Sequence, residues 1–134
     1  MVLVDTSVWI DFLRGAPTPQ VAALESLLEG EDLVGTAPII LQEVLQGADS
    51  PRRFEQWRRE FSGLMCYLPL DPIDTHVEAA RLYAACRRAG KTPRSSNDCL
   101  IARLALEHDL VLLEDDRDFD SIAKVEKRLR LFAS

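Results

Sequence analysis

The chain has 134 residues, of which 47% are hydrophobic and 28% are charged, and its formal net charge is −6. This length suits one domain with a hydrophobic core of its own, so we expect a single domain over residues 1–134. No apolar stretch approaches the roughly 18 residues that cross a membrane, and no basic segment precedes the apolar N-terminus. We therefore expect a cytoplasmic protein without a membrane helix or signal peptide.

The three cysteines, Cys66, Cys86 and Cys99, are an odd number and show no CxxC or Cys/His spacing. This pattern argues against a disulfide framework and against a zinc site. We expect all three to be small core residues.

Short apolar segments alternate with helical patterns along the whole chain. Four expected helices begin at a proline, which is favoured in the first helical turn, and a glycine follows each of them within two residues. The expected strands cover residues 2–4, 33–34, 65–70, 111–113 and 129–132. The expected helices cover residues 7–13, 19–29, 38–46, 51–61, 72–89, 96–108 and 119–125. In the helix over 72–89, Ile73, Val77, Ala80 and Ala84 recur at helical spacing and predict one apolar face.

Strands that alternate with helices, with few hairpin signals, indicate a parallel sheet covered on both faces. We expect an α/β fold, a three-layer α/β/α sandwich. In such folds ligands bind outside the carboxyl ends of the strands, where the strand order reverses. Two apolar runs end there in acids: VLV precedes Asp5, and VLL precedes Glu114, Asp115 and Asp116.

Asp5 and Asp116 each suit a local role as well. An aspartate before a helix caps its free N–H groups, and aspartates are common in turns such as the one at Asp116. Thr6 and Ser7 follow Asp5 and could hold a water or a substrate phosphate. Local hydrogen bonding at the strand-to-helix turn explains these two hydroxyls equally well.

Glu43 and Asp98 are expected on helices. Glu43 interrupts the apolar segment PIILQEVLQ, where a solvated glutamate is the simpler interpretation. Asp98 lies in a first helical turn, where the helix dipole favours a negative charge. Its neighbours three and four residues on, Ile101 and Ala102, belong to the face that should pack inward. A carboxylate on that face needs a compensating charge or metal.

Together the four acids suggest one site. Carboxylates gathered in one cleft repel one another unless cations neutralise them, and all-oxygen ligands suit Mg²⁺ or Mn²⁺. Divalent ions in such sites activate a water and stabilise the leaving oxygen of a phosphodiester, which predicts a metal-dependent nuclease.

Two other functions stay open at this point. A phosphatase that uses Asp5 as nucleophile would carry DxD at the first strand end, where this chain has DTS. A non-catalytic module for RNA or protein interaction would use the acids only to hold Mg²⁺. Metal-dependent RNA cleavage separates the nuclease from both alternatives.

Four segments in this order resemble a known family: DTSVW at the start, a glutamate in a helix a third of the way along, SSNDCLIARLAL, and LLEDDRDF near the end. They resemble the PIN-domain ribonucleases, in particular the VapC-type toxins of prokaryotic toxin–antitoxin modules. The resemblance spans nearly the whole chain and lies in the ordered set of segments, not in any one of them.

The resemblance implies a PIN-like fold and an Mg²⁺- or Mn²⁺-dependent endoribonuclease that is a homodimer and is blocked by a small VapB-type antitoxin. Carried over by position, it makes Asp5, Glu43, Asp98 and Asp116 the metal-binding and catalytic set, supported by Thr6. One departure concerns the last ligand. Two residues before the last acid, many members have Thr or Ser, whereas this chain has Glu114. Asp115 and Asp118 also flank Asp116, so either of them could replace or assist it.

A net charge of −6 normally disfavours binding to RNA phosphates, but metals at the site carboxylates would remove much of the excess negative charge. Basic residues also gather just before Asp98. The candidates for RNA binding are Arg87, Arg88, Lys91 and Arg94. The alternative for this group is a solvated helix end whose positive charges complement the helix dipole.

Overall fold

The computed structural model describes residues 1–30 and 33–133. Its five strands form one sheet in the order β3-β2-β1-β4-β5, and every pair of neighbours is parallel. The strands are β1 (Val2–Val4), β2 (Val34–Thr36), β3 (Met65–Cys66), β4 (Val111–Leu113) and β5 (Arg130–Leu131). Since β1 leads to β2 on one side and lies beside β4 on the other, the strand order reverses at β1.

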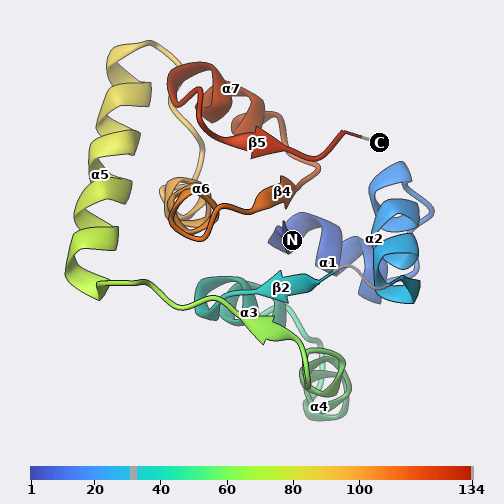
Figure 1. The fold of residues 1–134 in the computed structure, drawn as a ribbon. Helices are drawn as coiled ribbons and strands as arrows, with labels where there is room; N and C mark the ends of the chain where they lie inside the picture. The colour runs from blue at the N-terminus through green and yellow to red at the C-terminus, as the bar shows by residue number, and fades with distance from the viewer. Residues whose placement is uncertain (31–32, 134) are drawn as a thin grey trace.

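Seven helices cover the described part of the sheet: α1 (Thr6–Leu13), α2 (Pro19–Glu29), α3 (Pro38–Leu45), α4 (Pro51–Glu60), α5 (Pro72–Arg88), α6 (Asn97–Glu107) and α7 (Arg117–Val125). Helices α1 and α2 lie on one side of the strands, and α5 and α6 lie on the opposite side (Figure 1). The expected three-layer α/β/α architecture is confirmed. None of the described helices has the length and apolar character needed to span a membrane.

Helix starts follow the local chemistry of the sequence. Helices α2, α3, α4 and α5 each have proline in their first turn, where its missing N–H costs nothing. The side chains of Thr18, Ser50 and Asp71 accept hydrogen bonds from backbone N–H groups at the start of α2, α4 and α5. These capping bonds satisfy donors that have no partner inside the helix.

The central strands are buried because helices cover both faces of the sheet. Leu3 and Val4 of β1 and Leu112 of β4 are fully buried, which explains why these strands read as continuous apolar runs. Trp9 of α1 and Phe119 of α7 are among the largest buried side chains. The core thus lies directly behind the carboxyl ends of β1 and β4.

Strand β3 is shorter than expected. The sequence predicts a strand over 65–70, but β3 covers only Met65–Cys66. Its one neighbour, β2, ends at Thr36, whose carbonyl accepts the last bond from the Tyr67 N–H at 2.8 Å. Helix α3 begins at Pro38, so the chain beyond Tyr67 has no strand beside it to pair with.

The predicted apolar face of α5 does not pack against the rest of the domain. Ile73 is 78% exposed and Val77 is 47% exposed, and Ala80 is exposed as well. The buried residues of α5 are instead Thr75, Ala79 and Cys86, because this other side packs against α6. Periodicity identified an apolar stripe but not which side of the helix meets the domain.

The cysteine prediction holds for two positions and fails for one. Cys86 and Cys99 are buried, whereas Cys66 is exposed on β3. The reason is that β3 is the edge strand and both of its residues are exposed.

Candidate active site

Two neighbouring strands deliver acidic residues to the same edge of the sheet. Asp5 follows β1 and Asp116 lies three residues beyond β4. Val4 of β1 is paired with Leu113 of β4, and the backbone N–H of Asp5 donates to the Leu113 carbonyl at 2.9 Å. This edge is the point at which the strand order reverses, where ligands bind in open parallel sheets.

Asp5 is 4% exposed and caps α1. Its Oδ2 accepts hydrogen bonds from the Ser7 hydroxyl at 2.8 Å and the Ser7 N–H at 3.3 Å. Burial raises the pKa of Asp5 from 3.8 to about 6; the Ser7 bonds oppose the shift and the charge of Glu43 adds to it. The local interpretation of Ser7 is confirmed, and capping leaves Asp5 with an uncompensated negative charge when it ionises.

Asp98 lies in the first turn of α6 and is partly buried. Burial raises its pKa from 3.8 to about 7, and the charges of Asp5, Asp116, Asp118 and Glu43 raise it further. Four carboxylates therefore lie close enough to Asp98 to disfavour its ionisation. A cation at this position would reverse that effect.

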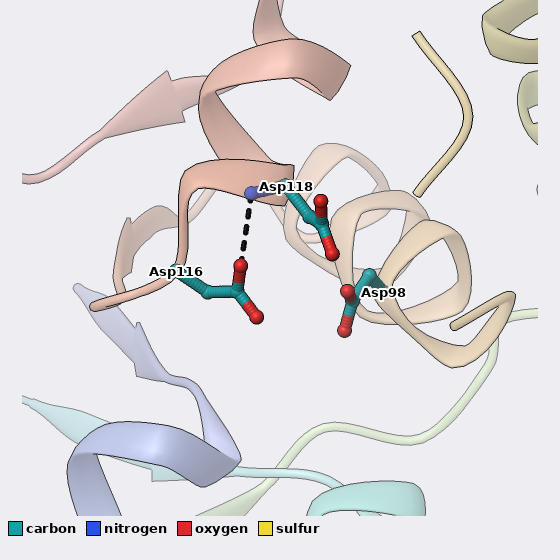
Figure 2. Close-up of side chains that lie close together, drawn as sticks. All are labelled: Asp98, Asp116 and Asp118. Atoms are coloured by element: carbon teal, nitrogen blue, oxygen red, sulfur yellow. Dashed lines mark hydrogen bonds between the residues drawn. The ribbon is translucent and has the colours of Figure 1, made fainter. Parts of the chain in front are cut away.

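Asp116 and Asp118 both lie at the start of α7. Asp116 caps the helix, and its Oδ1 accepts from the Asp118 N–H at 2.9 Å. Figure 2 shows the carboxylates of Asp116 and Asp118 facing the side chain of Asp98 across the gap between α7 and α6. One carboxylate oxygen from each of the three residues lies within 4.8 Å of the others.

The three acids near Asp116 lie in three different environments. Asp118 is buried and joins Asp98 and Asp116, whereas Asp115 is exposed. Glu114 accepts the Asp116 N–H at 2.7 Å, and burial raises its pKa. Glu114 thus shapes the turn that presents Asp116, which is a local bond that a hydroxyl side chain could also make.

Glu43 of α3 is held by two neutral donors. Thr6 Oγ1 donates to Glu43 Oε1 at 2.7 Å, and Asn97 Nδ2 donates to Oε2 at 3.4 Å. Glu43 lies outside the three-acid group, but its charge contributes to the raised pKa of both Asp5 and Asp98. Thr6 therefore contacts the site through Glu43.

Asn97 is a site residue that the sequence did not single out. It immediately precedes Asp98 at the start of α6, and that adjacency is the one signal that could have drawn attention to it. Its partner Glu43 is 54 residues away in the chain, so the contact depends on how α3 and α6 pack.

The donor chemistry fits a hard divalent cation. Asp98, Asp116 and Asp118 offer only oxygen, and carboxylate oxygens are the ligands that Mg²⁺ and Mn²⁺ prefer. Their spacing permits one ion to contact all three. Asp5 and Glu43 flank this group from β1 and α3.

The four basic candidates lie in two kinds of environment. Arg87 and Arg88 are exposed in the last turn of α5, and Lys91 is exposed in the segment that follows. Arg94 instead pairs with two of the acids, through Asp116 Oδ1 at 2.9 Å and Asp118 Oδ2 at 3.0 Å. These ion pairs lower the pKa of Asp118 against the effect of burial.

Comparisons with known proteins agree with this architecture. The family model described as PIN domain matches residues 2–125. The VapC ribonuclease Mb1587 of Mycobacterium bovis is 39% identical over 128 residues, which cover 93% of each chain. Ribonuclease VapC32 of Mycobacterium tuberculosis is 34% identical over 106 residues, covering 79% of this chain and 77% of that protein.

Solved structures show the same fold at lower identity. FitAcB from Neisseria gonorrhoeae superposes with a TM-score of 0.70 at 22% identity, covering 99% of this chain and 97% of that one. VapBC2 from Rickettsia felis, bound to a promoter DNA fragment, gives a TM-score of 0.70 at 17% identity, with 98% of each chain covered.

Proposed function

The chain belongs to the PIN-domain family and matches its VapC ribonucleases over nearly its full length, and from this premise we propose an Mg²⁺- or Mn²⁺-dependent endoribonuclease. It hydrolyses phosphodiester bonds of RNA and acts as the toxin of a VapBC-type toxin–antitoxin module. The observation that carries the proposal is the group of Asp98, Asp116 and Asp118 within 4.8 Å of one another. This group lies where the strand order reverses, beside buried Asp5.

In this mechanism Asp98, Asp116 and Asp118 would hold the cation, and Asp5 and Glu43 would add negative charge beside it. When bound, a divalent cation supplies the charge that activates water and stabilises the leaving oxygen of the phosphodiester. Thr6 and Asn97 fix both oxygens of Glu43, so that its carboxylate keeps one orientation. Hydrogen bonds of this kind commonly set the orientation of carboxylates at metal sites.

RNA approaches this surface past the exposed cations that precede α6. Arg87, Arg88 and Lys91 lie on the chain that leads into Asp98, and cations in such positions bind phosphates without reading sequence. Their role is to hold the RNA backbone near the carboxylates.

The toxin assignment includes partners and a location. The relatives named above are VapC ribonucleases, and VapBC2 bound to a promoter DNA fragment is among the solved structures that share the fold, so a small VapB-type antitoxin that blocks the site is the expected partner. The exposed apolar face of α5, with Ile73 and Val77, suits burial in a homodimer. We place the protein in the cytoplasm as one domain over residues 1–134.

A phosphatase that uses Asp5 as nucleophile is less well supported. Asp5 is 4% exposed, and its Oδ2 accepts both hydrogen bonds from Ser7. A nucleophilic carboxylate must reach the phosphorus in line with the leaving oxygen, which this burial opposes.

The test is cleavage of mixed RNA by the purified chain with Mn²⁺, with and without EDTA. We expect cleavage that EDTA abolishes and that Asp98→Asn reduces by roughly 100-fold or more, the scale of losing a preorganised charge at a reacting centre. Asp115→Asn is the matched control, because Asp115 is exposed beside the same site. Full activity in EDTA or in Asp98→Asn would overturn the proposal, and Mn²⁺ binding without cleavage would favour a non-catalytic module.

A further inference from the structure

Arg94 lies in the segment between α5 and α6 and contacts two of the three clustered acids. Its Nη2 is 2.9 Å from Asp116 Oδ1, and its Nε is 3.0 Å from Asp118 Oδ2. The backbone N–H of Arg94 also donates to Asp118 Oδ2 at 3.1 Å. Main chain and side chain together therefore fix Arg94 against the start of α7.

The guanidinium uses one oxygen of each carboxylate. Asp116 Oδ1 accepts from Arg94 and from the Asp118 N–H, and Asp118 Oδ2 accepts from the backbone and the side chain of Arg94. Both carboxylates lie on the side of α7 that faces Asp98 (Figure 2), and one oxygen of each is within 4.8 Å of an Asp98 oxygen. A cation held by these three residues would therefore lie immediately beside a permanent positive charge.

The charge balance of the cluster includes the guanidinium of Arg94. The three carboxylates of the cluster are offset by one guanidinium, which stays protonated at every physiological pH. A divalent cation must share Asp116 and Asp118 with this group, and two positive charges a few ångströms apart repel each other.

We propose that Arg94 is a resident counter-cation of the site, which competes with the divalent cation for Asp116 and Asp118 and lowers the affinity of the cluster for metal. The inference rests on the proposed function in one respect, that the cluster binds a divalent cation. It assigns Arg94 a different task from Arg87, Arg88 and Lys91. In the metal-free chain Arg94 stabilises the paired acids, and in the metal-bound chain it opposes the ion.

A purely positioning role for Arg94 gives the opposite result. If Arg94 only oriented Asp116 and Asp118, its removal would leave the two carboxylates less ordered and metal binding weaker. Competition predicts tighter metal binding, because removal frees two oxygens and deletes a positive charge. The sign of the change in affinity therefore separates the two roles.

The experiment is a titration of the metal-free chain with Mn²⁺ at low ionic strength. Binding is measured by calorimetry or by the electron paramagnetic resonance signal of free Mn²⁺. We expect Arg94→Gln to bind Mn²⁺ roughly ten-fold more tightly than the wild type or better. Arg94→Lys retains the charge without the two-pronged contact, so its affinity should fall between the two. Arg52→Gln is the control, because it removes an exposed charge of α4, outside the cluster. Unchanged or weaker binding by Arg94→Gln would overturn the inference.

A second readout uses stability. In EDTA, Arg94→Gln should unfold at a lower temperature than the wild type, because Asp116 and Asp118 lose their counter-charge. Addition of Mn²⁺ should then raise its Tm by more than it raises that of the wild type, since tighter binding to the folded state gives greater stabilisation. If Arg94→Gln does not fold, Arg94→Lys gives the same comparison with a smaller difference. An equal rise in Tm for variant and wild type contradicts competition.

Metal binding and RNA cleavage are separate measurements. A wild-type chain that binds Mn²⁺ and responds to Arg94→Gln as described, but leaves RNA intact, would overturn the ribonuclease and preserve the role of Arg94. If the wild type cleaves RNA but Arg94→Gln leaves the affinity for Mn²⁺ unchanged, the ribonuclease is supported and the role of Arg94 is overturned. Absence of Mn²⁺ binding by the wild type would overturn the inference as well.

Discussion

The two sides of the site hold their carboxylates in different ways. On the α7 side, Asp116 and Asp118 are bound by the cationic side chain of Arg94. On the β1 side, the hydrogen bonds that Asp5 and Glu43 accept from the described residues come from neutral groups, those of Ser7 and Thr6 among them. Asp98 faces both sides and is affected by the charges of both.

The two kinds of contact affect a carboxylate differently: neutral donors fix its orientation, whereas a cation also offsets its charge. Hydrogen bonds from Ser7 and Thr6 fix where the carboxylates point, but they leave the negative charge in place. Burial raises the pKa of Asp5 to about 6 although the Ser7 hydrogen bonds lower it, whereas Arg94 contributes to a lowered pKa at Asp118. An added cation would therefore stabilise the ionised carboxylates of Asp5 and Asp98 more than those of Asp116 and Asp118. Substitutions on either side of the site test this difference.

The largest effect is expected at Asp118, on the compensated side. Asp118→Asn removes one of three clustered carboxylates and one anchor of Arg94, so Mn²⁺-dependent RNA cleavage should fall by about 100-fold. The measurement is the initial rate of RNA cleavage over a range of Mn²⁺ concentrations. Asp115→Asn, one exposed position outside the cluster, should stay near wild-type activity. Equal losses in the two variants would show that Asp118 has no special place.

The next effect concerns Asp5 and stability, on the uncompensated side. The folded-state pKa of Asp5 is about 6, above its ordinary value of 3.8, so its contribution to stability is fully present below about pH 4 and is lost as the pH rises through about 6. Asn also caps helices and carries no charge. In EDTA at pH 8, Asp5→Asn should therefore raise the free energy of unfolding by roughly 1–3 kcal/mol.

Urea denaturation at pH 4.5 and pH 8 checks this expectation, since the gain from Asp5→Asn should be smaller at the lower pH. The folded-state pKa of Asp98 is also raised, to about 7, so its contribution to stability is likewise lost as the pH rises. Asp98→Asn should therefore also flatten the loss of stability between pH 4 and pH 7. Asp11→Asn, on the same helix as the Asp5 cap, serves as a control. A gain that is independent of pH would contradict the burial of an uncompensated carboxylate.

The smallest effect is expected at Thr6, which orders Glu43 without adding charge. Thr6→Val keeps the shape and removes the donor to Glu43 Oε1, so RNA cleavage should fall by about ten-fold, the lower end of losses at supporting hydrogen bonds. Thr6→Ser keeps a hydroxyl and should retain most of the activity. If both variants behave alike, the hydroxyl has no part in holding Glu43.

Local structure was the part of the fold most readily predicted from the sequence. The strands over residues 2–4 and 111–113 are confirmed to the residue, because each is a buried apolar run bounded by polar residues. Helix starts at prolines were equally readable. The apolar face of α5 was less informative, since Ile73 and Val77 form an apolar stripe that does not face the rest of the domain.

For the site, the sequence determined that carboxylates follow β1 and β4 and that Asp98 begins a helix with an inward face. Only the tertiary structure decided which acids meet and what neutralises them. Asp118 joins Asp98 while neighbouring Asp115 is exposed, and Arg94 lies against acids more than 20 residues further along the chain. Such contacts depend on the pairing of β1 with β4 and on the packing of α6 against α7. The physical reason is that spacing along a chain sets the direction of a side chain on its own element, whereas the distance between charges on different elements is set by how those elements pack.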